Sequence, residues 1–269
     1  MKLSIVIIGY NSWHFLEKNL ASLSFLKNDT ETEIIYVDNA SNDKTVTEME
    51  RLYPAVRIFR NTKNLGISKA RNRGIREATG KYIWLLDSDT EVSAEAANGM
   101  LTFMDNHPEA GICGCKMYGQ DGKVQPSCRK FPTISGKLKT AIHIVAGKFG
   151  CGLYTSFVRS NHYDTEVEMP FEVDYLIGAC QLIRKEAQER VGELDEKIFY
   201  GPEDADFCLR MKFAGYKVFY IPQVSIYHAY QRVTSHQLFS KLTRKHLQGL
   251  VYYFWKKSKR LPKSLRQPS

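Results

Sequence analysis

Residues 80–90 read GKYIWLLDSDT, and this stretch decides the class of fold. Its apolar part, 82–86, shows no alternation with polar residues, which is typical of a strand buried on both faces of a parallel sheet. Helical spacing of apolar residues flanks it over 67–78 and 94–106. Gly80 can close the first helix as a left-handed cap. A strand between two helices predicts crossover connections and an α/β fold.

The alternation of strands and helices extends outward from this stretch. A helix is predicted after Ser12, whose hydroxyl can cap it. Four more β-rich runs lie in the first 115 residues, at 3–8, 34–37, 56–59 and 110–117. After an irregular segment with some helical spacing over 138–146, strands are expected over 176–184 and 217–221 and helices over 185–191 and 203–214. The sequence predicts a mostly parallel central sheet with helices on both faces.

Charge is divided unevenly along the 269 residues, whose net charge is +9. Residues 207–269 hold 13 Lys or Arg and no Asp or Glu, whereas residues 1–206 carry a net charge of −4. A basic end on an acidic body indicates a polyanionic neighbour: a membrane face, a nucleic acid or a phosphate-bearing substrate. Six cysteines without a CxxC pair predict free thiols, and the lack of an 18-residue apolar stretch predicts a cytoplasmic protein that does not span a membrane.

Polar residues follow four of the predicted strands. They are Gly9-Tyr10-Asn11, the segments DNASND at 38–43 and NTKNLGISKARN at 61–72, and Asp87-Ser88-Asp89. Ligands of open α/β sheets bind beyond the carboxyl ends of the strands, although turns and helix caps also use these residue types. Asp87 and Asp89 can offer hard oxygen ligands to Mg²⁺ or Mn²⁺ near a substrate diphosphate.

Several cofactor motifs are missing from the sequence. It has no GxGxxG after the first strand, no GxxxxGK[ST] and no His/Cys spacing of a zinc site. Dinucleotide-dependent dehydrogenases and P-loop enzymes are therefore excluded.

A second acidic group, Glu203-Asp204-Ala205-Asp206, opens the helix predicted over 203–214. Asp206 and Arg210 have the i, i+4 spacing of a helix salt bridge. Asp204 has no such partner and can take a proton from a substrate hydroxyl as a general base. Glu203 and Asp204 can equally serve to complement the positive end of the helix dipole, which leaves two interpretations open.

Taken together, these segments resemble a family 2 glycosyltransferase of the GT-A fold, in its rhamnosyltransferase-like subgroup. The resemblance covers about residues 3–235 and rests on eight pieces in order: SIVIIGYNS, VDNASND, NTKNLGISKARNRGI, GKYIWLLDSDT, DGKVQPSCRKFPT, VDYLIGACQLIRKEA, VGELDEKIFYGPEDADFCLR and AGYKVFYIPQVSIYH. It implies a GT-A domain over 1–235, with a nucleotide-binding half over 1–115 and an acceptor-binding half over 116–235. Residues 236–269 would form a basic, amphipathic tail.

The resemblance also implies roles for individual residues. Asp204 would be the catalytic base, Asp89 the metal ligand, and His228 a contact of the metal or diphosphate, or else a structural histidine. Nucleotide-binding roles would fall to Tyr10, Asp38, Asn39, Asn64, Gly66, Asn72 and Asp87. The implied enzyme inverts the anomeric centre with Mg²⁺ or Mn²⁺. It takes a sugar, for which the subgroup suggests rhamnose, from a dTDP or UDP donor and passes it to a glycan or lipid-linked acceptor in cell-surface polysaccharide synthesis.

Aromatic and basic residues lie close together near the C-terminus, in LVYYFWKKSKR at 250–260. This pattern suits a helix at the membrane interface, on the cytoplasmic face of the inner membrane, or a tail that packs back on the domain. Two other functions stay open on sequence grounds. One is a non-catalytic module that binds a nucleotide or glycan on the same fold. The other, nucleic-acid binding, is disfavoured by the acidic body, so we expect no nucleic-acid partner.

Overall fold

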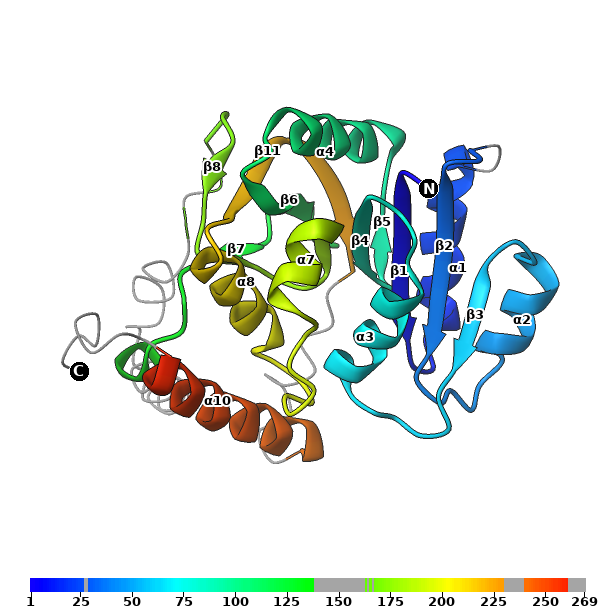
Figure 1. Cartoon of the computed structure of the whole chain (residues 1–269). Helices are drawn as coiled ribbons and strands as arrows, with labels where there is room; N and C mark the ends of the chain where they lie inside the picture. The colour runs from blue at the N-terminus through cyan, green and yellow to red at the C-terminus, as the bar shows by residue number, and fades with distance from the viewer. Residues whose placement is uncertain (27–28, 138–162, 164, 166, 230–239, 261–269) are drawn as a thin grey trace.

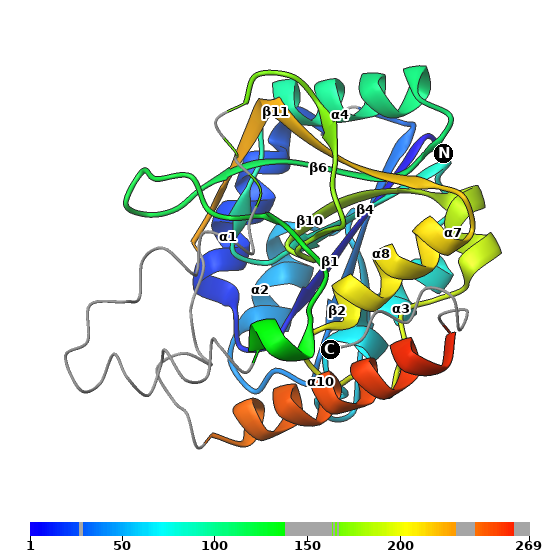
Figure 2. The same cartoon turned by 90° about the vertical axis from the view of Figure 1, so that its left-hand side faces the viewer.

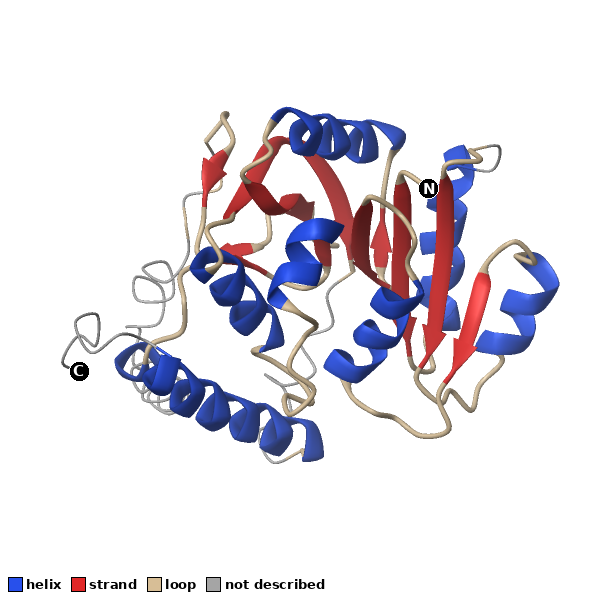
Figure 3. Ribbon diagram, in the orientation of Figure 1, coloured by secondary structure: helices blue, strands red, loops and turns tan. Residues whose placement is uncertain are grey.

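The computed structural model describes residues 1–26, 29–137, 163, 165, 167–229 and 240–260 (Figure 1). A nine-stranded sheet runs through its centre in the order β3-β2-β1-β4-β10-β6-β11-β5, with β8 added on β11. Helices cover both faces of this sheet, as Figure 3 shows by colour. The predicted α/β class is confirmed.

The first half of the sheet is parallel throughout. It consists of β1 (Leu3–Gly9), β2 (Thr32–Asp38), β3 (Arg57–Arg60) and β4 (Tyr82–Asp87). β1 lies between β2 and β4, with Gly9 opposite Asp38 and Ile8 opposite Asp87. Because the strands run in one direction, the polar residues that follow them gather at one edge of the sheet, as the sequence predicts.

Two hydrophobic cores form because successive side chains of a strand point to opposite faces. Leu3, Ile5 and Ile7 of β1 belong to one core, and Val6 belongs to the other. The first core is shared with α1 (Trp13–Ser22), the 3₁₀ turn η1 (Leu23–Leu26), α2 (Thr45–Leu52) and α4 (Ala94–Asn106). The second is shared with α3 (Ile67–Glu77), α7 (Lys185–Val191), α8 (Glu203–Phe213) and α10 (Lys241–Arg260).

The second half of the sheet mixes strand directions. β10 (Cys180–Arg184) is antiparallel to both β4 and β6 (Ala110–Tyr118), while β11 (Lys217–His228) is parallel to β6. The short strands β5 (Thr90–Glu91) and β8 (Phe171–Glu172) pair antiparallel with β11. A separate ribbon joins β7 (Cys128–Arg129) to β9 (Tyr175–Leu176).

Two local predictions are wrong. Gly80 does not cap α3, which ends at Glu77, and its φ is not positive. Instead, Gly80 lets the chain pass β1 closely, since a Cβ there would lie 2.7 Å from the backbone nitrogen of Ser4. Ser12 stands at the start of α1, but its side chain makes no capping hydrogen bond.

Other differences concern lengths and coverage. β11 continues to His228, seven residues past the predicted strand end, across a register shift between Ile221 and Ser225. The helix expected over 138–146 lies outside the described residues. The five cysteines that the structure describes are buried free thiols, in agreement with the prediction.

Helix α10 packs along the same side of the sheet as α8, at the lower edge of Figures 1 and 2. Leu250 and Tyr253 are buried. Lys256 is buried as well, and its Nζ lies 2.5 Å from Asp195 Oδ2 and 2.7 Å from Asp206 Oδ1. The predicted Asp206–Arg210 salt bridge is also present, at 2.9 Å. Among the described helices, none has the length and apolar character needed to cross a membrane.

Substituting Lys256 with Met tests how α10 is held. The change leaves the buried carboxylate of Asp206 and the partly buried carboxylate of Asp195 without their shared cation. The free energy of unfolding is therefore expected to fall by about 3 kcal/mol. Urea unfolding measures the difference. The exposed Lys241→Met is the matched control and should stay within about 0.5 kcal/mol of wild type. Equal stability of the two variants would contradict a docking role for Lys256.

Candidate active site

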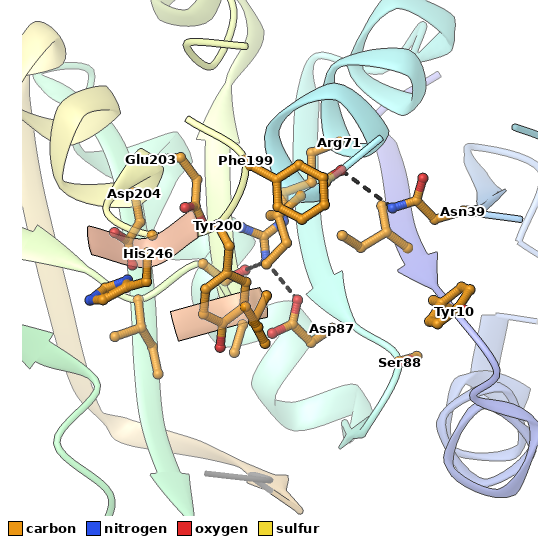
Figure 4. Close-up of a pocket in the computed structure, with 18 of the residues that line it drawn as sticks. Tyr10, Asn39, Arg71, Asp87, Ser88, Phe199, Tyr200, Glu203, Asp204 and His246 are labelled. Carbon is orange, nitrogen blue, oxygen red and sulfur yellow. Dashed lines mark hydrogen bonds and ion pairs between the residues drawn. The ribbon is translucent and has the colours of Figure 1, made fainter. Parts of the chain in front are cut away.

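A pocket of about 590 Å³ opens at the carboxyl ends of β1 and β4. Its lining draws on the loops after β1, β2, β3 and β4, on β7 and β9, on the start of α8 and on α10. Figure 4 shows Tyr10 and Asn39 at one side of this pocket and Asp204 and His246 at the other, with Arg71 and Asp87 between them. Seven of the predicted nucleotide and metal residues line it together: Tyr10, Asn39, Asn64, Gly66, Asp87, Asp89 and His228. The predicted base, Asp204, lines it as well.

Asn39 organises the loop on the Tyr10 side of the pocket. Its Oδ1 accepts hydrogen bonds from Asn61 Nδ2 at 3.1 Å and from the backbone N–H of Leu65 at 3.0 Å. Its Nδ2 donates to Asn64 Oδ1 at 3.1 Å. Gly66 has a φ of 85°, and a Cβ there would lie 2.5 Å from Phe199 O. Glycine is therefore required where this loop touches the other half of the chain.

Two predicted residues, Asp38 and Asn72, do not line the pocket. Asp38 is buried, and its carboxylate accepts from the backbone N–H of Ser41 at 3.1 Å. Asn72 is fully buried, and its side chain hydrogen-bonds the backbone of Leu194. It donates to the carbonyl at 2.9 Å and accepts from the N–H at 3.0 Å. Both side chains support loops that adjoin the pocket.

Asp87, Asp89 and His228 form a candidate cation site, with one ligand atom from each lying within 4.8 Å of the others. The pairing of β5 with the end of β11, which sets His228 opposite Thr90, brings the histidine to the acids. His228 Nε2 lies 3.4 Å from Asp89 Oδ1, and its Nδ1 lies 2.8 Å from Gln125 Oε1. In the tautomer whose Nδ1–H donates to Gln125 Oε1, the lone pair of Nε2 is available to a cation beside the acids. Two carboxylates and an oriented imidazole fit a divalent cation.

Arg71 was not predicted as a site residue, yet it is buried and lines the pocket between Asp87 and Glu203. Its Nη2 donates to Asp87 Oδ1 at 2.6 Å and to the carbonyl of Gly178 at 2.8 Å, and its Nη1 lies 3.4 Å from Glu203 Oε1. Burial opposes the charged guanidinium, but the carboxylates of Asp87 and Glu203 outweigh it and raise the pKa of Arg71. One sequence signal could have identified Arg71. It lies on the core-facing side of α3 with Ala70 and Ile75, and an arginine at such a position needs buried partners.

Glu203 and Asp204 begin α8 and have different surroundings. Glu203 is buried against Arg71, and burial followed by the charge of Asp204 raises the pKa of its carboxyl. Asp204 is only half-buried and accepts from the backbone N–H of Ala205 at 2.7 Å. Burial raises the pKa of Asp204 as well. A carboxylate that faces a pocket and has a raised pKa is suited to accept a proton.

Further pocket residues were not singled out from the sequence. They come from three places: Arg129 and Tyr175 from the small ribbon, Phe199 and Tyr200 from the loop before α8, and Leu242 and His246 from α10. The first four lie within segments that resemble the family, but those segments gave them no role. Leu242 and His246 lie outside these segments and reach the pocket only through long-range packing.

Known proteins share both the sequence pattern and the fold. The family model "Glycosyl transferase family 2" matches residues 4–192. The N-acetylglucosaminyl-diphospho-decaprenol L-rhamnosyltransferase of Mycobacterium tuberculosis is 28% identical over 262 residues, covering 93% of this chain and 83% of its own. A dTDP-rhamnosyl transferase of Shigella flexneri is 27% identical, covering 83% of this chain and 68% of its own.

Among solved structures, a mannosyltransferase from Pyrobaculum calidifontis in complex with GDP-Man and Mn²⁺ superposes with a TM-score of 0.64 at 18% identity, covering 97% of this chain and 65% of that one. The GT-A fold expected from the sequence is thereby confirmed. With a family match over most of its length, the chain belongs to glycosyl transferase family 2, and rhamnosyltransferases are among the proteins that it resembles.

Proposed function

We propose that the chain is a metal-dependent, inverting glycosyltransferase that moves L-rhamnose from dTDP-rhamnose to a sugar hydroxyl of a lipid-diphosphate-linked acceptor. The observation that carries this proposal is the convergence of the Asp87–Asp89–His228 cluster and of Asp204 on one pocket. Two relatives supply the donor and acceptor classes: one is a dTDP-rhamnosyl transferase, and the other is an N-acetylglucosaminyl-diphospho-decaprenol L-rhamnosyltransferase. A UDP-linked sugar is the alternative donor.

The nucleotide would bind on the Tyr10 side of the pocket. The Tyr10 side chain is 50% exposed and offers a ring on which a base can stack. Asn39, Asn64 and Gly66 would shape the pocket below it. Asp38 remains a proposed contact of the nucleotide base. Its carboxylate would then bind both that base and the backbone N–H of Ser41. Asn72 would act through the Leu194 loop that it holds.

Asp87, Asp89 and His228 would hold Mg²⁺ or Mn²⁺. The mixed oxygen and imidazole ligands favour Mn²⁺, because imidazole is a better ligand for transition metals than for Mg²⁺. When bound, the cation supplies charge neutralisation for the leaving diphosphate. Asp87 already shares one oxygen with Arg71, which would fix its orientation for this role.

Asp204 would act as the general base. It would take the proton of the acceptor hydroxyl as that oxygen attacks the anomeric carbon from the side opposite the diphosphate, so one displacement inverts the configuration. The bond to the diphosphate breaks, and the proton remains on Asp204 until the product leaves. Glu203, paired with Arg71, would hold the first turn of α8 in place.

The Asp204→Asn variant tests the base. An amide cannot take the proton, so transfer is expected to fall by about 100- to 10,000-fold while dTDP binding is retained. Because the pKa of Asp204 is raised by burial, transfer by wild type should decline on the acid side at a pH above the range of an ordinary aspartate. Transfer assays across pH and calorimetric titration of dTDP measure both effects. Near wild-type transfer by Asp204→Asn would exclude this residue as the base.

The Asp89→Asn variant tests the cation site. In wild type, dTDP is expected to bind more tightly with Mn²⁺ than without it. Loss of one charged metal ligand should reduce the gain in dTDP affinity that Mn²⁺ provides by about 10- to 100-fold. Calorimetry with dTDP, UDP and GDP, each with Mn²⁺, Mg²⁺ or EDTA, provides the measurement. Asp121→Asn, on an exposed loop outside the pocket, is the control. Equal dTDP affinity with Mn²⁺ and with EDTA would remove Asp89 as a metal ligand.

Contact with a membrane is part of the proposal, and the outer face of α10 supports it. Leu247, Val251 and Trp255 are more than half exposed and recur every four residues, so they share one side of the helix. Lys241, Arg244 and Lys259 are exposed on the same helix, which contains no acidic residue. Lys259 Nζ lies 4.4 Å from the centre of the Trp255 ring. An apolar stripe with a basic border suits an anionic lipid surface.

A Val251→Glu variant tests this contact. An acid in the middle of the stripe is expected to reduce co-sedimentation with vesicles of phosphatidylglycerol and phosphatidylcholine by at least about tenfold. The exposed Leu52→Glu, on α2, is the control and should bind as wild type does. Failure of the wild-type protein to bind these vesicles at low salt would contradict a membrane role for α10.

A further inference from the structure

Helix α10 meets the loop before Asp204 at very short range. A Cβ on Gly249 would lie 2.5 Å from the carbonyl oxygen of Gly201, and a Cβ on Gly201 would lie 2.8 Å from Nδ1 of His246. Two glycines therefore allow the helix backbone and the loop to touch. Further along α10, Lys256 pairs with Asp195 and with Asp206 of α8. The helix is therefore held at two places, beside the pocket and beside α8.

This contact brings His246 into the pocket, next to the proposed base. Figure 4 shows its imidazole beside Asp204, on the side away from Tyr10. The Tyr200 ring stands at its edge, with ring centres 6.1 Å apart. Leu242, one helical turn earlier, lines the same wall. An aromatic ring, an aliphatic side chain and an imidazole together form a surface of the kind that binds a sugar through a few placed polar groups.

The imidazole of His246 lies against the backbone of Tyr200 and Gly201, whose hydrogen-bonding groups act on its pKa. Its Nδ1 is buried and makes no hydrogen bond of normal geometry with the described residues. His228 differs, because Gln125 holds its Nδ1. Burial and the nearby Lys137 lower the pKa of His246, which keeps the ring neutral at pH 7. A neutral imidazole can donate to or accept from a ligand hydroxyl without competing with Asp204 for a proton.

We propose that His246 is an acceptor-specificity residue: it hydrogen-bonds a hydroxyl of the acceptor sugar and so positions the attacking hydroxyl at Asp204. This inference rests on the proposed transferase function and goes beyond it, because it makes α10 a wall of the acceptor subsite. The bond forms in the ground state and persists in the transition state, so its loss raises the KM for the acceptor and changes kcat little.

The test compares His246→Ala, His246→Gln and the exposed control Gln248→Ala. Three quantities are measured: the KM and kcat for N-acetylglucosaminyl diphosphate on a short prenyl chain with dTDP-rhamnose, hydrolysis of dTDP-rhamnose without acceptor, and the Kd for dTDP with Mn²⁺. His246→Ala is expected to raise the acceptor KM about 3- to 10-fold, as for loss of one hydrogen bond. Its donor hydrolysis and dTDP affinity should stay within about twofold of wild type.

His246→Gln retains a hydrogen-bonding group and should recover most of the acceptor KM, while Gln248→Ala should match wild type. An unchanged acceptor KM in His246→Ala overturns the inference. An equal loss of donor hydrolysis and dTDP affinity also overturns it, because it shows that His246 only supports the fold. Wild-type protein that neither transfers nor hydrolyses the donor overturns the proposed function itself, and this inference with it.

Discussion

The buried guanidinium of Arg71 is the interaction on which the geometry of the pocket depends. It binds Asp87 at the end of β4, the carbonyl of Gly178 before β10, and Glu203 at the start of α8. These groups come from both halves of the chain. Because the guanidinium is buried away from bulk water, removing it would strongly lower the free energy of unfolding. Gly178 has no side chain because a Cβ would collide with the guanidinium. The guanidinium of Arg71 thus sets the positions of Asp87, a proposed metal ligand, and of Glu203, which precedes the proposed base Asp204.

A second set of contacts closes the same arrangement from the sides. Gly66 touches the Phe199 carbonyl, and the N–H of Ile67 donates to that carbonyl at 2.8 Å. On the far side, the pairing of β5 with β11 carries His228 to Asp89. Both contacts join residues far apart in the sequence. The distance between the Asp87–Asp89 group and the Glu203–Asp204 group is therefore set by the sheet and not by either loop. A rigid frame is what a displacement needs, because the attacking oxygen and the leaving group must lie in line.

The fold was largely predictable, because its first half repeats buried strands and amphipathic helices whose periods differ clearly. α4 and α7 have the bounds that the sequence predicts. The antiparallel insertion of β10 between β4 and β6 could not be predicted, because strand order depends on packing between distant segments. The same limit explains the site. Asp87 and Asp89 follow a recognisable strand, whereas Arg71 and His246 reach the pocket only through tertiary contacts.

Helix α10 carries two sequence signals at once, and for this reason its sequence left open both a helix at the membrane interface and a tail packed on the domain. Its inner face bears Leu250, Tyr253 and Lys256, which pack on the domain, while its outer face bears the apolar stripe and the basic border. His246 and Trp255 are nine residues apart, about 14 Å along a helix that rises about 1.5 Å per residue. In the proposed arrangement, a bilayer under the outer face therefore lies within reach of the acceptor wall. A lipid-linked sugar has its hydroxyls just above that surface, so a single helix would satisfy the need to hold both the membrane and the acceptor.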